Sequence, residues 1–138
     1  MNWKLIFQLS LLGLVMAFGT ISLIPAHYEF IFWLVIFIFC AYTIAKRCAD
    51  GYFAHGFLTG VVNCVWISAV HLFFYQAYMT NHPDIGAMNS HMPISLQEHP
   101  RLLTTASGLF IGLISAVILG LFAFIASRFV KSNAVKAA

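Results

Sequence analysis

One histidine lies within a long apolar stretch of the sequence and is the first candidate for chemistry. His71 follows Cys64 by seven residues and precedes Tyr75 and Tyr78 by four and seven, so all four share one helix face. An ionisable group inside a membrane is costly and usually faces the interior of a helical bundle. We expect either a proton-sensitive or ligand-contacting site at His71, or a neutral imidazole bonded to a neighbouring helix. The residues of this candidate intramembrane polar site are His71, Asn63, Tyr75 and Gln76.

The residue types and spacings argue against catalysis. An active site needs an acid, a base or a nucleophile within reach of one another. Cys64 and His71 are the only such pair within the apolar stretches, and they are about 10 Å apart along one helix, too far for a hydrogen bond. The sequence has no HExxH motif and no phosphate-binding loop. We therefore predict a protein that is not an enzyme and has no cofactor.

Three histidines lie in the loop between the third and fourth apolar stretches, at positions 82, 91 and 99. Imidazole with carboxylate suits zinc, and imidazole with thioether suits copper. The gaps between His82, His91 and His99 are nine and eight residues, which is not the tight spacing of metal ligands. They are candidate ligands for a metal, but we favour the explanation that they belong to an ordinary polar loop.

The composition indicates that lipid, not water, surrounds most of this chain. Hydrophobic residues make up 62% of the 138 residues and charged residues only 8%, whereas soluble domains have about a quarter charged residues. The net charge is +3, and no basic cluster resembles a nucleic-acid-binding patch. We predict one membrane domain and no nucleic-acid partner.

The hydropathy pattern predicts four transmembrane helices. A span needs about 20 mainly apolar residues. Pro25 ends the first stretch, because proline interrupts a helix interior, and Lys46 and Arg47 end the second. The predicted spans are residues 5–24, 29–45, 55–78 and 102–130.

The first apolar stretch has a second interpretation as a cleaved signal peptide. Ala17, Phe18 and Gly19 resemble the small-residue cleavage site of such peptides. The apolar run continues beyond them, which favours a retained helix.

The basic residues predict the orientation of the spans. Cytoplasmic loops are enriched in lysine and arginine. Arg101 is alone on one side, and the other side holds six basic residues: Lys4, Lys46, Arg47, Arg128, Lys131 and Lys136. We predict both termini and loop 46–54 in the cytoplasm, with loop 79–101 outside it.

Small residues recur at helical spacing and predict where helices touch. Lipid tails are as apolar as leucine, so close backbone approach through small residues stabilises helix pairs in membranes. We expect such contacts within one chain, with a dimer seam as the alternative use of the last span. The predicted packing residues are Gly56, Gly60, Gly108, Gly112, Ala116 and Gly120.

The order of these features resembles a family of bacterial four-span membrane proteins, the domain-of-unknown-function family 4199. The resemblance covers nearly the whole chain and implies an all-α integral membrane fold, a four-transmembrane-helix bundle with N-in/C-in topology in the bacterial cytoplasmic (inner) membrane. The family has no established activity, so the resemblance implies no reaction. The residues that carry it are Ala45-Lys46-Arg47, Gly51 to Phe57, Gly60, Tyr75, Tyr78, Asn81 to Asp84, Gly108, Gly112, Gly120, Arg128 and Lys131.

These observations favour a small non-enzymatic inner-membrane protein with a structural or accessory role. Such a protein is surrounded by membrane lipid and acts through contacts between its helices and those of another copy of itself or of a different protein. Two alternatives remain open at this point. One is a small oligomeric transporter or pore, and the other is a metal- or pH-responsive membrane protein that uses the outer-loop histidines.

Overall fold

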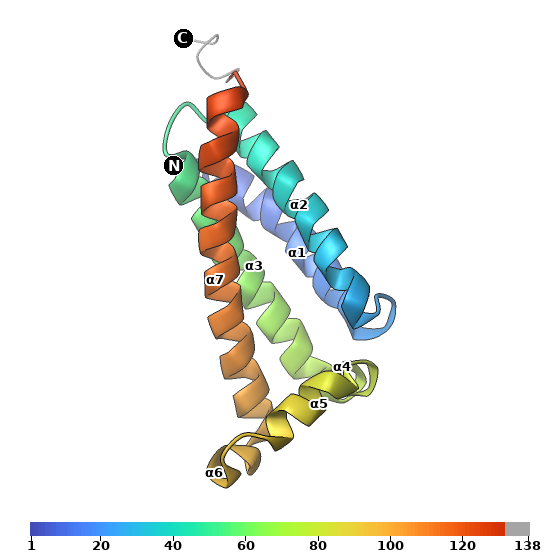
Figure 1. The fold of residues 1–138 in the computed structure, drawn as a ribbon. Helices are drawn as coiled ribbons and strands as arrows, with labels where there is room; N and C mark the ends of the chain where they lie inside the picture. Colours follow the sequence, from blue (N-terminus) through green and yellow to red (C-terminus); the bar gives the residue numbers. More distant parts are fainter. Residues whose placement is uncertain (132–138) are drawn as a thin grey trace.

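Four long helices form the body of the protein, for which we describe residues 1–131 of a computed structural model. They cross one another as an open bundle (Figure 1). Each is long and apolar enough to cross a membrane, and no β-strand occurs in residues 1–131. The all-helical class with four candidate membrane spans is therefore confirmed. The long helices are α1 (Trp3–Ser22), α2 (Ala26–Arg47), α3 (Tyr52–Phe73) and α7 (Pro100–Phe129).

Three short helices connect α3 to α7 across one end of the bundle. They are α4 (Tyr75–Asn81), α5 (Pro83–Ser90) and α6 (Ile94–Gln97). We call this end, which also holds the turn between α1 and α2, the loop end (Figure 1). The opposite end, where the chain begins and α7 finishes, is the terminal end.

The bend at Phe74 divides the predicted third helix in two. The sequence predicts a helix that continues to residue 78, but α3 stops at Phe73. Phe74 leaves the helical conformation with φ −103° and ψ 31°, although its amide still bonds to the Val70 carbonyl at 2.9 Å. The bend turns α4 across the loop end, where the Asn81 amide donates to the Ile21 carbonyl of α1. This contact explains why an apolar and aromatic run does not form one straight helix.

Proline and a left-handed glycine define the other turns. Pro25 is extended, with ψ 144°, and α2 begins at the next residue, three positions before the predicted start. Gly51 precedes α3 with φ +60°, a conformation that favours glycine over other residues. At the chain start, the Asn2 side chain accepts a hydrogen bond from the Leu5 amide at 3.1 Å and caps α1.

The closest helix pair is α3 with α7, while α1 packs on α3 and α2 packs on α7. Small residues allow this approach. Gly60 lies against the backbone of Ala116, and a Cβ at Gly56 would lie 2.7 Å from the Leu119 carbonyl oxygen. That distance is shorter than a side-chain carbon tolerates, so these positions require glycine while the helices keep this spacing.

The remaining predicted packing residues divide along the length of α7. Gly112 lies against Cys64, and a Cβ at Gly120 would lie 2.8 Å from the Phe53 ring. Gly108 is different, because a Cβ there would meet only the Ser68 hydroxyl at 4.0 Å. The contact between α3 and α7 is therefore tight toward the terminal end and loose toward the loop end.

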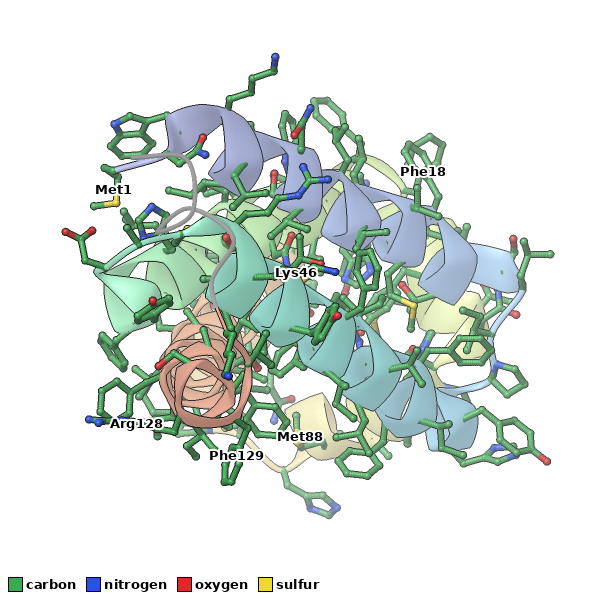
Figure 2. The ribbon with its side chains drawn as sticks, turned by 90° about the horizontal axis from the view of Figure 1, so that it is seen from above. Met1, Phe18, Lys46, Met88, Arg128 and Phe129 are labelled. Atoms are coloured by element: carbon green, nitrogen blue, oxygen red, sulfur yellow. The ribbon has the colours of Figure 1, made fainter. Side chains whose placement is uncertain are left out.

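The buried apolar residues follow the same gradient. A smaller cluster of Ala17, Ile21 and Val70 lies toward the loop end. Elsewhere large apolar side chains project outward from the bundle, as Phe18 and Phe129 do in Figure 2. The larger cluster lies toward the terminal end and contains Leu5, Leu9, Cys40, Ala41, Ile44, Cys48, Leu119 and Ala123.

Gly60→Ala should destabilise the bundle, because the added methyl group would collide with the Ala116 backbone. Overpacking of this kind costs about 1–3 kcal/mol. Gly108→Ala is the matched control, since its methyl group enters open space and should change stability little. Thermal unfolding in a mild detergent measures both. Equal unfolding temperatures for the two variants would contradict the close approach at Gly60.

Candidate functional site

Three aromatic rings stack at the loop end of the bundle. His71, near the end of α3, lies on Tyr78 of α4 with ring centroids 3.9 Å apart and planes 19° apart. Tyr78 in turn lies on His82, which follows α4, with centroids 4.4 Å apart. We call His71, Tyr78 and His82 the ring stack. It exists because the bend at Phe74 brings α4 back beneath the last turn of α3.

The first histidine of the ring stack is bonded to α1. The Thr20 hydroxyl donates to the Ala17 carbonyl at 2.9 Å, so its oxygen accepts from the Nε2–H group of His71 at 3.0 Å. This arrangement fixes the imidazole tautomer with its hydrogen on Nε2. A neighbouring helix thus supplies a hydrogen-bond partner for His71, as in one of the two alternatives considered for this residue.

The last histidine of the ring stack is bonded to α2. His82 Nδ1 donates to the Tyr78 carbonyl at 3.0 Å, and His82 Nε2 lies 2.7 Å from Glu29 Oε1. Both ring nitrogens of His82 therefore face oxygen atoms that can accept a hydrogen bond, one of them in the Glu29 carboxyl group. The His82 side chain is 2% exposed and that of Glu29 is 24% exposed. Such a shielded pair interacts more strongly than a surface salt bridge.

The position of Glu29 is favourable for a negative charge. Glu29 lies in the first turn of α2, immediately after the chain reverses at Pro25. The amide groups at a helix N-terminus stabilise a nearby carboxylate. The ring stack and its two polar ends thereby connect α1, α2, α3 and α4 at the loop end.

Tyr78 is the middle ring and the most enclosed phenol of the site. Burial raises the pKa of Tyr78 to about 12 from its ordinary value of 10, and the negative charges of Glu29 and Asp84 add to this effect. The neutral phenol is therefore the form that the folded site stabilises.

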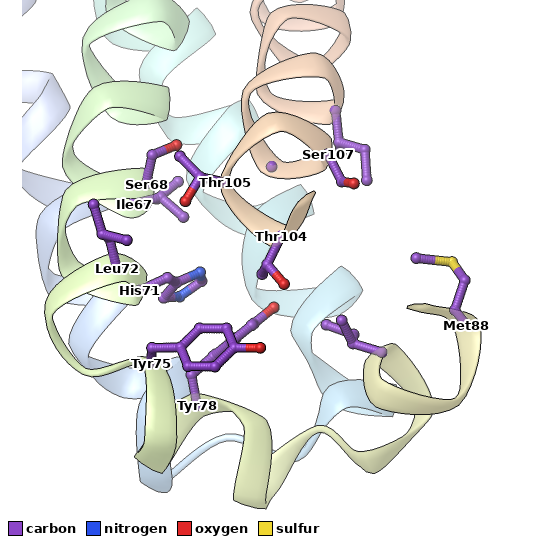
Figure 3. A pocket seen from close by; sticks show the side chains of 13 residues that line it. Ile67, Ser68, His71, Leu72, Tyr75, Tyr78, Met88, Thr104, Thr105 and Ser107 are labelled. Carbon is purple, nitrogen blue, oxygen red and sulfur yellow. The ribbon is translucent and has the colours of Figure 1, made fainter. Parts of the chain in front are cut away.

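A cavity of about 90 Å³ lies beside the ring stack, between α3, α5 and α7. Figure 3 shows the side chains of Tyr75 and Tyr78 directed into the space between α3 and α7. His71 and Ser68 line it from α3, and Thr104, Thr105 and Ser107 line it from α7. Its remaining surface is mainly apolar: Ile67, Leu72, Ile85, Met88, Gly108 and Ile111.

The four polar residues singled out in the sequence do not form one site. His71 and Tyr75 both line the cavity, whereas Gln76 is exposed. Asn63 is buried two turns away against Gly13 of α1, and neither atom of its side-chain amide has a hydrogen-bond partner in the described part of the chain. Cys64, expected on the same face as His71, lies against α7.

The outer-loop histidines are also separated from one another. His82 is buried in the ring stack, whereas His91 and His99 are exposed. Among residues 1–131, no three histidine, cysteine, aspartate or glutamate side chains lie close enough together to hold a metal ion.

A second buried histidine lies at the terminal end and has a structural role. His55 Nδ1 donates to the Gly51 carbonyl at 2.9 Å, and its Nε2 accepts from the Asn2 amide at 2.9 Å. These bonds attach the start of α1 to the start of α3.

Sequence reasoning missed Thr20 and Glu29, the two polar residues that complete the site. Glu29 and His82 are 53 residues apart, and no local pattern indicates their pairing. The four-residue spacing of Tyr78 and His82 is a usable signal, because residues four apart in a helix are neighbours.

No family model matches the chain, and the comparisons found no similar curated protein and no similar solved structure. The resemblance to the domain-of-unknown-function family 4199 therefore stays a prediction from the sequence.

Removal of the Glu29 carboxylate should loosen the loop end. Glu29→Ala leaves the buried His82 without its acceptor, which costs about 1–3 kcal/mol. Thermal unfolding in detergent measures the loss, and faster hydrogen exchange in α4 locates it. Glu98→Ala is the control, because it removes an exposed carboxylate between α6 and α7, at the same end of the bundle. If the two variants were equally stable, the Glu29–His82 pair would contribute nothing to the fold.

The raised pKa of Tyr78 predicts a loss of stability in alkali. The phenol ionises near pH 10 in the unfolded chain but near pH 12 in the folded one, so the stabilisation is fully present below pH 10. It falls as the pH rises from 10 to 12, by about 2 kcal/mol at the upper limit. Unfolding measured across this range should be less pH-dependent in Tyr78→Phe. An unchanged alkaline profile in this variant would contradict the prediction.

Proposed function

We propose that this chain is a small non-enzymatic protein of the bacterial cytoplasmic membrane that serves as an accessory component and acts through its outer helix surfaces. The observation that supports this most directly is the ring stack. Its two imidazoles hydrogen-bond to other groups of the same chain, and its three stacked rings hold the helices together. Polar residues used in this way support a structural role.

The arrangement of reactive groups argues against an enzyme. His82 has both nitrogens engaged, and His71 uses Nε2 to reach Thr20. The Cys64 thiol points toward the Leu109 carbonyl, with sulfur and oxygen 3.7 Å apart, and packs on Gly112. A nucleophile with a base beside it, which covalent catalysis requires, is not formed by these residues.

The packing of the long helices argues against a pore through one chain. The backbones of α3 and α7 touch at Gly56, Gly60 and Gly112, so side chains and backbone fill the space between them. The buried side chain of Asn63 on α3 contacts Gly13 of α1, so the space between these two helices is filled there as well.

The outer surface of α2 offers an area for contacts with lipid or with another helix. Only a narrow side of α2 packs on the bundle, through Cys40, Ala41, Ile44 and Ala45. Large apolar side chains project from the rest of the helix, and helix surfaces of this kind associate in membranes by close packing. They are Phe30, Ile31, Phe32, Leu34, Val35, Ile38, Phe39 and Tyr42.

The distribution of charge supports a topology with both termini in the cytoplasm. Lys4, Lys46, Arg47, Arg128 and Lys131 gather at the terminal end, and Arg101 is at the loop end. Lys136 lies outside the described residues. The rule that cytoplasmic loops are positive therefore places the ring stack near the outer face of the membrane.

The accessory role predicts a complex without transport. Native mass spectrometry of protein extracted in a mild detergent should show a defined complex with a second copy or another protein. The double variant Val35→Ala, Phe39→Ala removes apolar bulk from the outer face of α2 and should weaken that complex about tenfold, while Phe110→Ala on α7 leaves it intact. A strictly monomeric chain that conducts ions or protons in liposomes would contradict the proposal.

A further inference from the structure

We propose that the cavity between α3, α5 and α7 binds a membrane phospholipid, with an ester carbonyl at Tyr75 and Tyr78 and the phosphate at Arg101. This inference goes beyond the accessory role but rests on the membrane location proposed with it.

The cavity contains phenol groups that lack a partner within the protein. Tyr78 is 9% exposed, and its hydroxyl makes no hydrogen bond to any of residues 1–131. The Tyr75 hydroxyl is likewise without a hydrogen bond in the described chain, and both side chains point into the cavity (Figure 3). A ligand that supplies an acceptor can therefore bond to these phenols without displacing a partner within the protein.

Two of the other hydroxyl groups that line the cavity already donate within the protein. The Ser107 hydroxyl donates to the Leu103 carbonyl, and the Thr105 hydroxyl donates to the Arg101 carbonyl, each at 2.8 Å. The two phenols, by contrast, donate to no acceptor within residues 1–131, so both can donate to a ligand. A ligand that presents a carbonyl oxygen matches them, because a carbonyl accepts and does not donate.

The positive charge nearest to the cavity belongs to Arg101. Its guanidinium lies 5.5 Å from the centroid of the Tyr75 ring, on the same phenol that lines the cavity. Arginine is well suited to phosphate, which it binds through two parallel hydrogen bonds. A glycerophospholipid carries a carbonyl and a phosphate separated by a few atoms, and in a membrane it is the abundant molecule that matches both groups.

The apolar lining continues to the outside of the bundle. Leu72, Met88 and Ile111 line the cavity and are also exposed, so an acyl chain can leave the cavity along an apolar surface. The cavity volume of about 90 Å³ matches an ester group with a few adjoining carbons, since a water molecule occupies about 30 Å³. The remainder of the lipid would lie along the outer surface.

The depth of the cavity agrees with the position of lipid esters. With 30 residues, α7 is about 45 Å long, which exceeds the hydrocarbon core of about 30 Å. With the excess length at the loop end, the first turns of α7, which carry Arg101 and Thr104, would reach into the headgroup layer. The cavity would then lie at the depth where ester carbonyls meet the acyl chains.

Native mass spectrometry can test this site on the whole protein, purified in a mild detergent with phosphatidylglycerol and phosphatidylethanolamine vesicles as the lipid source. We expect one retained phospholipid per chain. Tyr78→Phe keeps the ring of the ring stack but removes the donor, and should lower retention about fivefold. Arg101→Gln should lower it by a similar factor. Tyr42→Phe changes an exposed tyrosine on α2 and is the matched control, with unchanged retention.

Equal retention in Tyr78→Phe and Tyr42→Phe would overturn the site. Retention of an isoprenoid quinone in place of a phospholipid would overturn the phosphate contact at Arg101 and with it the proposal. Flotation of the same samples with vesicles distinguishes a failure of the membrane location from a failure of the lipid site. Protein that does not float contradicts the membrane location itself, whereas floating protein with variant-independent retention contradicts only the lipid site.

Discussion

The close contact between the backbones of α3 and α7 is the constraint on which the rest of the structure depends. In water, a bundle gains stability from burial of apolar side chains, but lipid tails remove that advantage. Contact at Gly60 with Ala116, and at Gly56 with Leu119, replaces it with dense packing between backbones. The outer helices α1 and α2 then attach to opposite members of this pair.

That contact does not extend along the whole bundle, and the polar site forms where it ends. Beyond Gly112 toward the loop end, α7 no longer touches α3 closely, as the open space at Gly108 shows. Here the ring stack connects the helices in place of close backbone contact. Thr20 hydrogen-bonds to one end of the stack and Glu29 to the other. A hydrogen bond or an ion pair at such a place gains strength because the surroundings exclude water.

The fold could be predicted from the sequence to the extent that its signals were local. Pro25, Lys46 and Arg47 indicated the ends of α2 to within a few residues, and the four-residue spacing of small residues indicated the faces that meet. The end of α3 could not be predicted, because Leu72, Phe73 and Phe74 continue the apolar pattern without a break. The bend at Phe74 is fixed by contacts of α4 with α1, and contacts between distant segments leave no periodic trace in the sequence.

The difference between local signals and contacts of distant segments also explains why the sequence indicates His71 but not its partners in the site. An imidazole in an apolar stretch is conspicuous by composition alone, but Thr20 and Glu29 are ordinary residues until the bend brings α4 beside them. Once α4 turns, Tyr78 has to enter the space that α3 and α7 leave open, because both of its ring faces are covered by His71 and His82. The edge of the phenol then points into the cavity, where its hydroxyl meets no protein acceptor. The ring stack and the cavity are therefore two consequences of one bend, and a donor that the fold leaves unsatisfied is a reason to look for a ligand there.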